Sequence, residues 1–189
     1  MDLKFRIRQW SISAIWIVLF LIFSGRIEAQ NKNYAAGLSG GISNFESLSA
    51  SVTGIHLNAS FEFPVWFSRA FNFKASLFYI RKTEFFLPED ESNYYPYFYG
   101  ASFSGIMRQK INSPFYIEEH AGLMVLKNNF FGSISETNYG ITFGAAGGID
   151  FRAGNETGFL LSLGYNGGIT FNGSTPSFNS FLLQGQLFF

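Results

Sequence analysis

The sequence contains no cysteine, which excludes disulfide bridges and thiolate metal sites. Charge is also scarce, because Asp, Glu, Lys and Arg make up 14% of the chain. Soluble domains carry about 25%. Acidic and basic residues balance at 13 each, so the chain lacks the excess of positive charge that is typical of nucleic-acid-binding proteins. The aromatic residues, by contrast, reach 20% of the chain.

The N-terminus has the three parts of a secretory signal peptide. Lys4, Arg6 and Arg8 form a basic region, residues 10–23 are apolar, and Ala29 supplies a small residue at a cleavage site. The apolar run falls short of the ~20 residues that a spanning helix needs, although an uncleaved anchor is the alternative. We therefore expect a signal peptide over residues 1–29 and one exported domain over residues 30–189.

Within residues 30–189, large apolar and small or polar residues alternate with a period of two, which is typical of strands. Tyr139, Ile141 and Phe143 share one face of the clearest run, and Gly140 and Thr142 share the other. Eight such runs cover residues 34–43, 54–63, 71–82, 97–107, 115–127, 139–152, 158–168 and 180–189.

The polar face of these runs distinguishes a membrane barrel from a soluble β protein. It carries mostly Gly, Ala, Ser and Asn, where a strand facing water usually carries Lys, Glu and Thr. Small residues suit the crowded interior of an eight-stranded barrel, and the bulky face then lies in lipid. The backbone of a sheet in lipid needs internal partners, so the sheet must close. We predict an all-β fold, an eight-stranded antiparallel transmembrane up-and-down β-barrel, with a soluble β protein as the alternative.

The connections between the runs indicate an orientation. Those over residues 64–70, 108–114 and 153–157 are short, whereas others, such as 83–96, are longer and more polar. Bacterial barrels have short periplasmic turns and longer extracellular loops. We expect an outer-membrane protein, in contact with lipid, whose two termini are periplasmic.

The last run carries apolar residues at alternate positions up to a terminal aromatic: Phe181, Leu183, Leu187 and Phe189. Here the chain resembles the small bacterial outer-membrane barrels, of the OmpA or OmpX type or the PorT type. The resemblance implies that this strand is an assembly signal read by the barrel-assembly machinery. No peptidoglycan-binding domain follows, so the cell-wall role of OmpA does not carry over.

Six charged residues fall in the inward phase toward the periplasmic half: Glu62, Lys74, Arg108, Glu118, Asp150 and Arg152. Buried charges persist when they are paired, so we expect an ionic plug in the lumen. Phe78, Ile80, Phe98, Ile106 and Met124 are also inward. A lumen filled in this way predicts no general porin activity.

A lipid A-modifying barrel enzyme, a deacylase or an acyltransferase, is the alternative function. His56 and His120 face inward, and Glu62 and Glu118 lie on the same strands. However, the deacylase motif places Ser-Asn after its His, and His56-Leu57-Asn58 lacks that Ser. Glu118 and His120 alone are too few for a metal site. We assign no catalytic residue, no metal and no cofactor.

Two places suggest contact with another outer-membrane protein, and they favour a structural, adhesive or assembly-partner role. Segment 83–96 combines acidic residues with aromatic residues that supply contact area, among them Phe85, Phe86, Tyr94 and Tyr95. Tyrosines at the membrane interface are the alternative explanation. Glu119 lies in the apolar phase of its strand, and an interfacial Glu without a role is the alternative there.

Overall fold

The computed structural model describes residues 33–47, 50–65, 71–86, 95–129, 135–152, 157–171 and 176–189. The expected signal peptide, residues 1–29, lies outside these ranges. The described chain forms eight strands and one short 3-10 helix, η1: β1 Ala35–Ser47, β2 Ala50–Pro64, β3 Phe71–Lys82, η1 Thr83–Phe85, β4 Tyr97–Asn112, β5 Phe115–Asn129, β6 Glu136–Asp150, β7 Gly158–Thr170 and β8 Ser177–Phe188. None of the described helices is long and apolar enough to cross a membrane.

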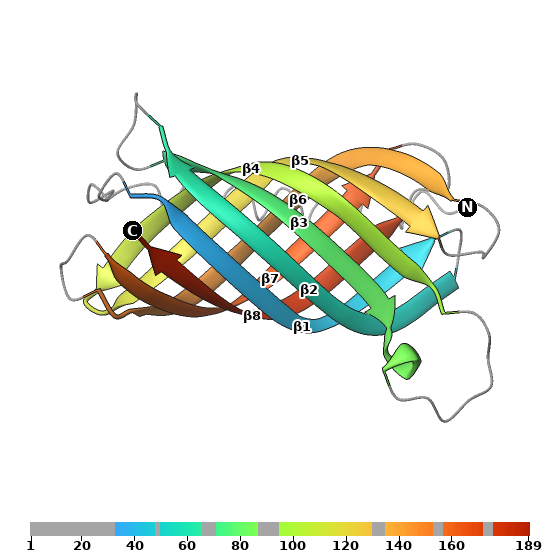
Figure 1. Ribbon diagram of the computed structural model, residues 1–189, viewed down its shortest axis with the longest axis horizontal. Coiled ribbons are helices and arrows are strands. Elements are labelled where there is room, and N and C mark those ends of the chain that lie inside the picture. The colour runs from blue at the N-terminus through green and yellow to red at the C-terminus, as the bar shows by residue number, and fades with distance from the viewer. Residues whose placement is uncertain are drawn as a thin grey trace, which may run out of the picture.

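The strands form a closed barrel in which each pairs antiparallel with its sequence neighbours (Figure 1). β1 also pairs with β8, from Ala35 opposite Phe188 to Glu46 opposite Ser177. The ring therefore has no free edge, and its backbone groups find partners within the sheet. The predicted eight-stranded antiparallel barrel is confirmed.

Several strands are longer than the alternation of the sequence predicts. β1 continues to Ser47 and β2 begins at Ala50, so residues 44–53 pair with one another rather than forming a loop. The sequence pattern did not reveal this hairpin, because it carries polar residues such as Asn44 and Thr53. The backbone nevertheless pairs beyond the apolar stretch. The connection between β1 and β2 therefore shrinks to residues 48–49, and the expected contrast in connection lengths rests mainly on residues 83–96.

Two ends of the barrel can be distinguished. At the terminal end, where β1 begins and β8 finishes, the amide of Phe189 donates to the carbonyl of Tyr34 at 3.0 Å. The opposite end, which we call the loop end, carries η1, where β3 ends and β4 begins (Figure 1).

The two faces of the strands differ as the alternation predicts. Large apolar side chains cover the outside, where Leu38 is 73% exposed and Leu123 is 70% exposed. Three inward positions of β6 are glycines, Gly140, Gly144 and Gly148, and a Cβ at Gly140 would lie 2.0 Å from the carbonyl oxygen of Ile169 on β7. The small inward residues thus allow β6 and β7 to pack closely.

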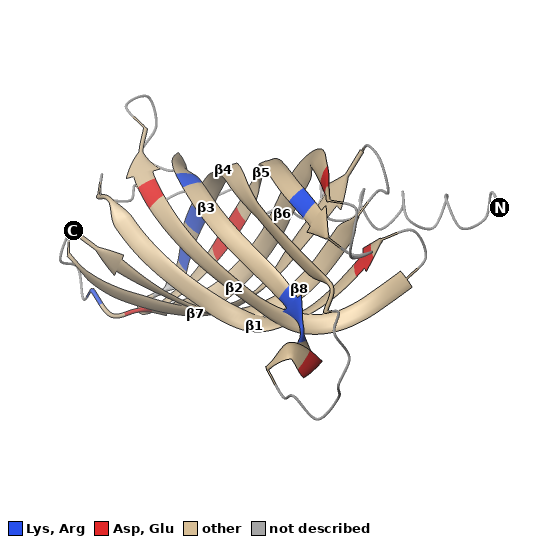
Figure 2. Cartoon of the chain, turned by 45° about the vertical axis from the view of Figure 1, so that its right-hand side comes forward, with Lys and Arg blue, Asp and Glu red and all other residues tan. Residues whose placement is uncertain are grey.

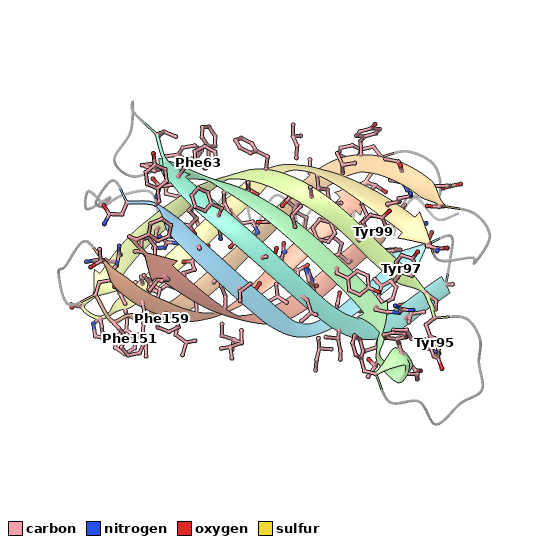
Figure 3. All side chains as sticks on the ribbon, viewed as in Figure 1. Phe63, Tyr95, Tyr97, Tyr99, Phe151 and Phe159 are labelled. Carbon is pink, nitrogen blue, oxygen red and sulfur yellow. The ribbon has the colours of Figure 1, made fainter. Side chains whose placement is uncertain are left out.

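Aromatic side chains gather on the outside near both ends. Figure 3 shows Phe63, Phe151 and Phe159 near the terminal end, and Tyr97 and Tyr99 near the loop end. Aromatic belts of this kind mark the two interfaces of membrane proteins. The apolar band between them is the surface that lipid or detergent would cover.

The closed hydrogen-bonded ring should resist detergent until it is heated. We expect purified protein in detergent to be rich in β structure and to migrate faster on a denaturing gel when unheated than when boiled. Recovery as a soluble periplasmic protein without a mobility shift would contradict the membrane-barrel interpretation.

Candidate functional site: the filled lumen and the outer wall

Four buried charged side chains form one ion-paired cluster in the terminal half of the lumen. The strand register places Glu62 opposite Lys74 and Arg108 opposite Glu118. Nζ of Lys74 lies 2.5 Å from Oε1 of Glu118 and 3.6 Å from Oε1 of Glu62. The four residues come from the neighbouring strands β2 to β5, in the order acid, base, base, acid. Figure 2 colours the acidic and basic positions of the barrel.

Arg108 joins both carboxylates of this cluster. Its Nη2 donates to Oε1 of Glu62 at 3.0 Å, and its Nε donates to Oε2 of Glu118 at 3.0 Å. Each of the four residues is at most 5% exposed. Two acids and two bases thus balance, which a low-dielectric interior requires.

Gln186 of β8 completes the cluster, because the pairing of β1 with β8 brings the last strand close to β2. It accepts a hydrogen bond from Nη2 of Arg108 at 2.9 Å and donates to Glu62. Sequence reasoning used only the outward phase of the last strand and missed Gln186. The signal was present, because Ser180, Leu182, Gln184 and Gln186 occupy the inward phase.

Asp150 and Arg152 form a second, separate pair nearer the terminal end. Nη2 of Arg152 lies 2.8 Å from Oδ2 of Asp150, and Nε donates to Oδ1 at 2.9 Å. The guanidinium also lies 4.2 Å from the ring centre of Phe188. The structure therefore divides the six charged residues into a group of four and a pair, since the backbone turns immediately after β6.

An apolar layer fills the lumen nearer the loop end. Phe45 and Phe98 meet edge to face at 5.0 Å between ring centres, and Phe78 and Phe178 lie 5.4 Å apart. This cluster contains Phe45, Phe78, Ile80, Phe98, Met124, Leu126 and Phe178. Side chains from five strands meet here, because an eight-stranded barrel is just wide enough to be filled.

A small polar cavity of about 30 Å³ lies along the lumen, bordered by Phe78 of the apolar layer and by Lys74 and Glu118 of the ionic cluster. Asn58, Ser76, His120 and Asn166 also line it. It has room for on the order of two water molecules. Nε2 of His120 lies 3.3 Å from Oδ1 of Asn166.

His56 has a serine partner, but the geometry does not resemble an accessible catalytic site. Its Nδ1 lies 2.7 Å from Oγ of Ser180, which in turn donates to Oγ of Ser43 at 2.8 Å. His56 and Ser180 are both 0% exposed, and Phe78 and Phe178 pack against the imidazole. The Ser180 hydroxyl is therefore enclosed by side chains of the lumen. Among the residues that the structure describes, no group of His, Asp and Glu could hold a metal ion.

The predicted assembly-signal residues line the outside of the closing strand. Phe181 is 66% exposed, and Leu183, Leu187 and Phe189 are 55–56% exposed. Phe181 packs against Tyr165 of β7, with 5.8 Å between ring centres.

Glu119 faces outward on β5, opposite Met107 of β4 and Ala145 of β6. Its Oε2 has no hydrogen-bond partner among the described residues. On the β6 side the outward neighbours Ala145 and Gly147 are small, and a Cβ at Gly147 would meet nothing closer than 4.0 Å. Glu119 is therefore an outward residue beside small residues of β6, and its Oε2 is buried.

The aromatic residues near η1 form a compact group at the loop end. Phe85 contacts Phe86 and Tyr95, with ring centres 5.2 and 5.7 Å apart. The guanidinium of Arg81 lies 3.3 Å from the ring centre of Phe85. Tyr94 lies outside the described residues.

Comparison with solved structures identifies the architecture. Neisserial surface protein A (NspA) is 13% identical with a TM-score of 0.61, over 85% of this chain and 99% of that one. Ail, the attachment invasion locus protein of Yersinia pestis, is 13% identical with a TM-score of 0.52, over 85% of this chain and 100% of that one. This chain has the fold of the small eight-stranded outer-membrane barrels. No family model and no curated protein matches the sequence.

Identities this low establish the fold alone. The chain spans nearly the full length of NspA and Ail, so the likeness extends over all eight strands. The resemblance to small OmpA- or OmpX-type barrels is thereby confirmed at the level of architecture, and nothing distinguishes a PorT-type barrel.

The ionic cluster predicts a large and specific stability effect. Replacing Arg108 with Met leaves two buried carboxylates with one cation, and breaking such a cluster costs about 3–5 kcal/mol. Urea unfolding followed by the gel-mobility shift should show this loss. Lys110→Met is the control, because Lys110 is 40% exposed at its side chain and 3.9 Å from Asp150, so it should cost less than about 1 kcal/mol.

The double variant Arg108→Met/Glu118→Leu removes one charge of each sign and should recover part of the stability. Equal stabilities of Arg108→Met and the Lys110 control would show that the buried charges do not hold the lumen together.

Proposed function

We propose that this protein is an integral outer-membrane barrel with a plugged lumen that acts through its surfaces, in a structural, adhesive or assembly-partner role. The observation that carries this proposal is the filled interior, in which an ionic cluster and an apolar layer follow one another along the barrel. If the described side chains close the lumen in this way, the outer wall and the ends of the barrel are the surfaces left for function.

The proposed orientation puts both termini in the periplasm and the loop end outside the cell. Segment 83–96, the longest connection, belongs to the loop end. Long connections face outward in bacterial barrels. The aromatic group of Phe85, Phe86 and Tyr95 would then be presented at the cell surface, and an adhesive role is in keeping with the likeness to Ail, an attachment protein by its name.

Glu119 would serve as a second contact, on the barrel wall. Burying a carboxylate without a partner is unfavourable, and nothing among the described residues offers Oε2 a donor. The small neighbours Ala145 and Gly147 would let another protein in the membrane approach it closely. The occupant proposed here is an outer-membrane protein that presents a hydrogen-bond donor.

The plug predicts that reconstituted protein is closed to small solutes. Liposomes containing the protein should not swell in small sugars, whereas liposomes with a general porin should. Swelling at the porin's rate would mean that Phe45, Phe98 and the ionic cluster leave a continuous channel.

Cysteine crosslinking in intact membranes tests the partner contacts. Phe85→Cys and Glu119→Cys should give protein crosslinks well above those of Leu163→Cys. Leu163 is the matched control, because it lies outward on β7 and is 64% exposed. If neither position exceeds Leu163, the partner contacts do not exist and the role is confined to the membrane.

A further inference from the structure

A basic and aromatic surface lies on the outside of β3, β4 and β5 at the loop end. Two successive cross-strand rows build it. The first places Arg81 opposite Tyr97 and Tyr97 opposite Asn129, and the second places Tyr79 opposite Tyr99 and Tyr99 opposite Lys127. We call these six residues the headgroup patch.

The side chains of the headgroup patch are arranged by contacts with one another. Nη1 of Arg81 donates to the hydroxyl of Tyr79 at 2.8 Å, and its guanidinium carbon lies 5.5 Å from the ring centre of Tyr97. Nζ of Lys127 lies 5.8 Å from the ring centre of Tyr99. The amide of Asn129 donates to the hydroxyl of Tyr97 at 2.8 Å. The two cations thus flank a pair of stacked tyrosines. Figure 3 labels these tyrosines, Tyr97 and Tyr99.

Neither cation of the patch has an acidic partner among the described residues. Lys82, by contrast, forms an ion pair of 3.1 Å with Glu84 at the same end. The pKa of the Glu84 carboxyl lies below its ordinary value, mainly because its own backbone amide hydrogen-bonds to the carboxylate and secondly because the Lys82 side chain does. This carboxylate therefore stays ionised beside Lys82. Nε of Arg81 is buried and has no hydrogen-bond acceptor.

The depth of the patch indicates which anion would meet these cations. The next outward row toward the middle of the barrel is apolar and contains Leu77, Ala101 and Val125. Arg81 and Lys127 share the outward phase of that row, so they lie just beyond the apolar band. In a membrane this is the level of the lipid headgroups, where Tyr, Lys and Arg are favoured.

The terminal end lacks this chemistry. Its outward belt consists largely of phenyl rings such as Phe63, Phe73 and Phe103, which pack on one another. No cation of the described residues lies in the outward phase there, since Arg152 and Lys110 both pair with Asp150. The two leaflets that cover this barrel therefore meet different surfaces.

We propose that the headgroup patch binds the phosphate groups of a phosphorylated glycolipid in the outer leaflet, with Arg81 and Lys127 as the phosphate ligands and tyrosine hydroxyls as further donors. Charged hydrogen bonds from Arg and Lys are the strongest that a phosphate can receive. The location in the outer leaflet rests on the orientation under Proposed function, whereas phosphate binding by the patch does not.

The test uses full-length mature protein in zwitterionic detergent, titrated with bisphosphorylated lipid A and read by native mass spectrometry. We expect Arg81→Gln/Lys127→Gln to bind about tenfold more weakly than the unsubstituted protein. Lys82→Gln is the matched control, because it removes a cation from the same end in the other phase, and its affinity should be unchanged. Arg81→Lys/Lys127→Arg keeps both charges and should retain most of the affinity.

Dephosphorylated lipid A should bind the unsubstituted protein as weakly as the phosphorylated form binds the double glutamine variant. Equal affinities of the double variant and the Lys82 control would overturn the proposal. Displacement of lipid A by equimolar inorganic pyrophosphate would also overturn it, because the site would then favour a soluble anion. The gel-mobility shift establishes that each variant is folded.

Orientation is tested separately, by labelling Glu84→Cys in intact cells with a membrane-impermeant maleimide. Absence of labelling together with phosphate-dependent binding in detergent would refute the orientation and leave the binding site standing. Labelling without phosphate-dependent binding would refute the headgroup patch alone.

Discussion

The pairing of β1 with β8 is the interaction on which the rest of the molecule depends. It converts an eight-stranded meander into a ring, so that every strand has two partners and no edge is left to aggregate or to face lipid unpaired. Closure also brings residues from the ends of the domain into one interior. Gln186 of β8 reaches Glu62 and Arg108, and Ser180 of β8 reaches His56, only because the ring is closed.

In a ring this narrow, the side chains of each strand point alternately into the lumen and to the outside. Inward positions must fill a small space, and they do so with glycines where neighbouring strands approach, an apolar layer toward one end and balanced charges toward the other. The charged residues are compatible with burial because two acids on β2 and β5 flank two bases on β3 and β4, and each carboxylate of the four-residue cluster meets both cations. The interior is thus a core of an apolar layer and a polar section, and the proposed function assigns the functional surface to the outside.

The outer wall differs at its two ends. Phenyl rings stack on one another at the terminal end, whereas tyrosines, an arginine and a lysine share two cross-strand rows at the loop end. Phenyl rings suit an apolar boundary, while hydroxyl and cationic groups suit a polar, anionic one. Glu119 departs from both patterns as an outward carboxylate between Met107 of β4 and Ala145 of β6.

By itself the sequence determined the number of strands, their alternation of faces and the residues that point inward, because a period of two needs only local information. It predicted β3 with its observed bounds, and it placed Phe78, Phe98 and Met124 in the interior. Strand ends were less predictable: the polar residues of the β1–β2 hairpin resemble a loop, although backbone pairing extends over them. Which inward residues meet was decided only by the tertiary structure, since the stagger and closure of the ring bring together groups far apart in the chain. The separation of Asp150 and Arg152 from the four-residue cluster, the role of Gln186 and the juxtaposition of Arg81 with Lys127 across Tyr97 and Tyr99 all follow from cross-strand register, which alternation along a single strand does not encode.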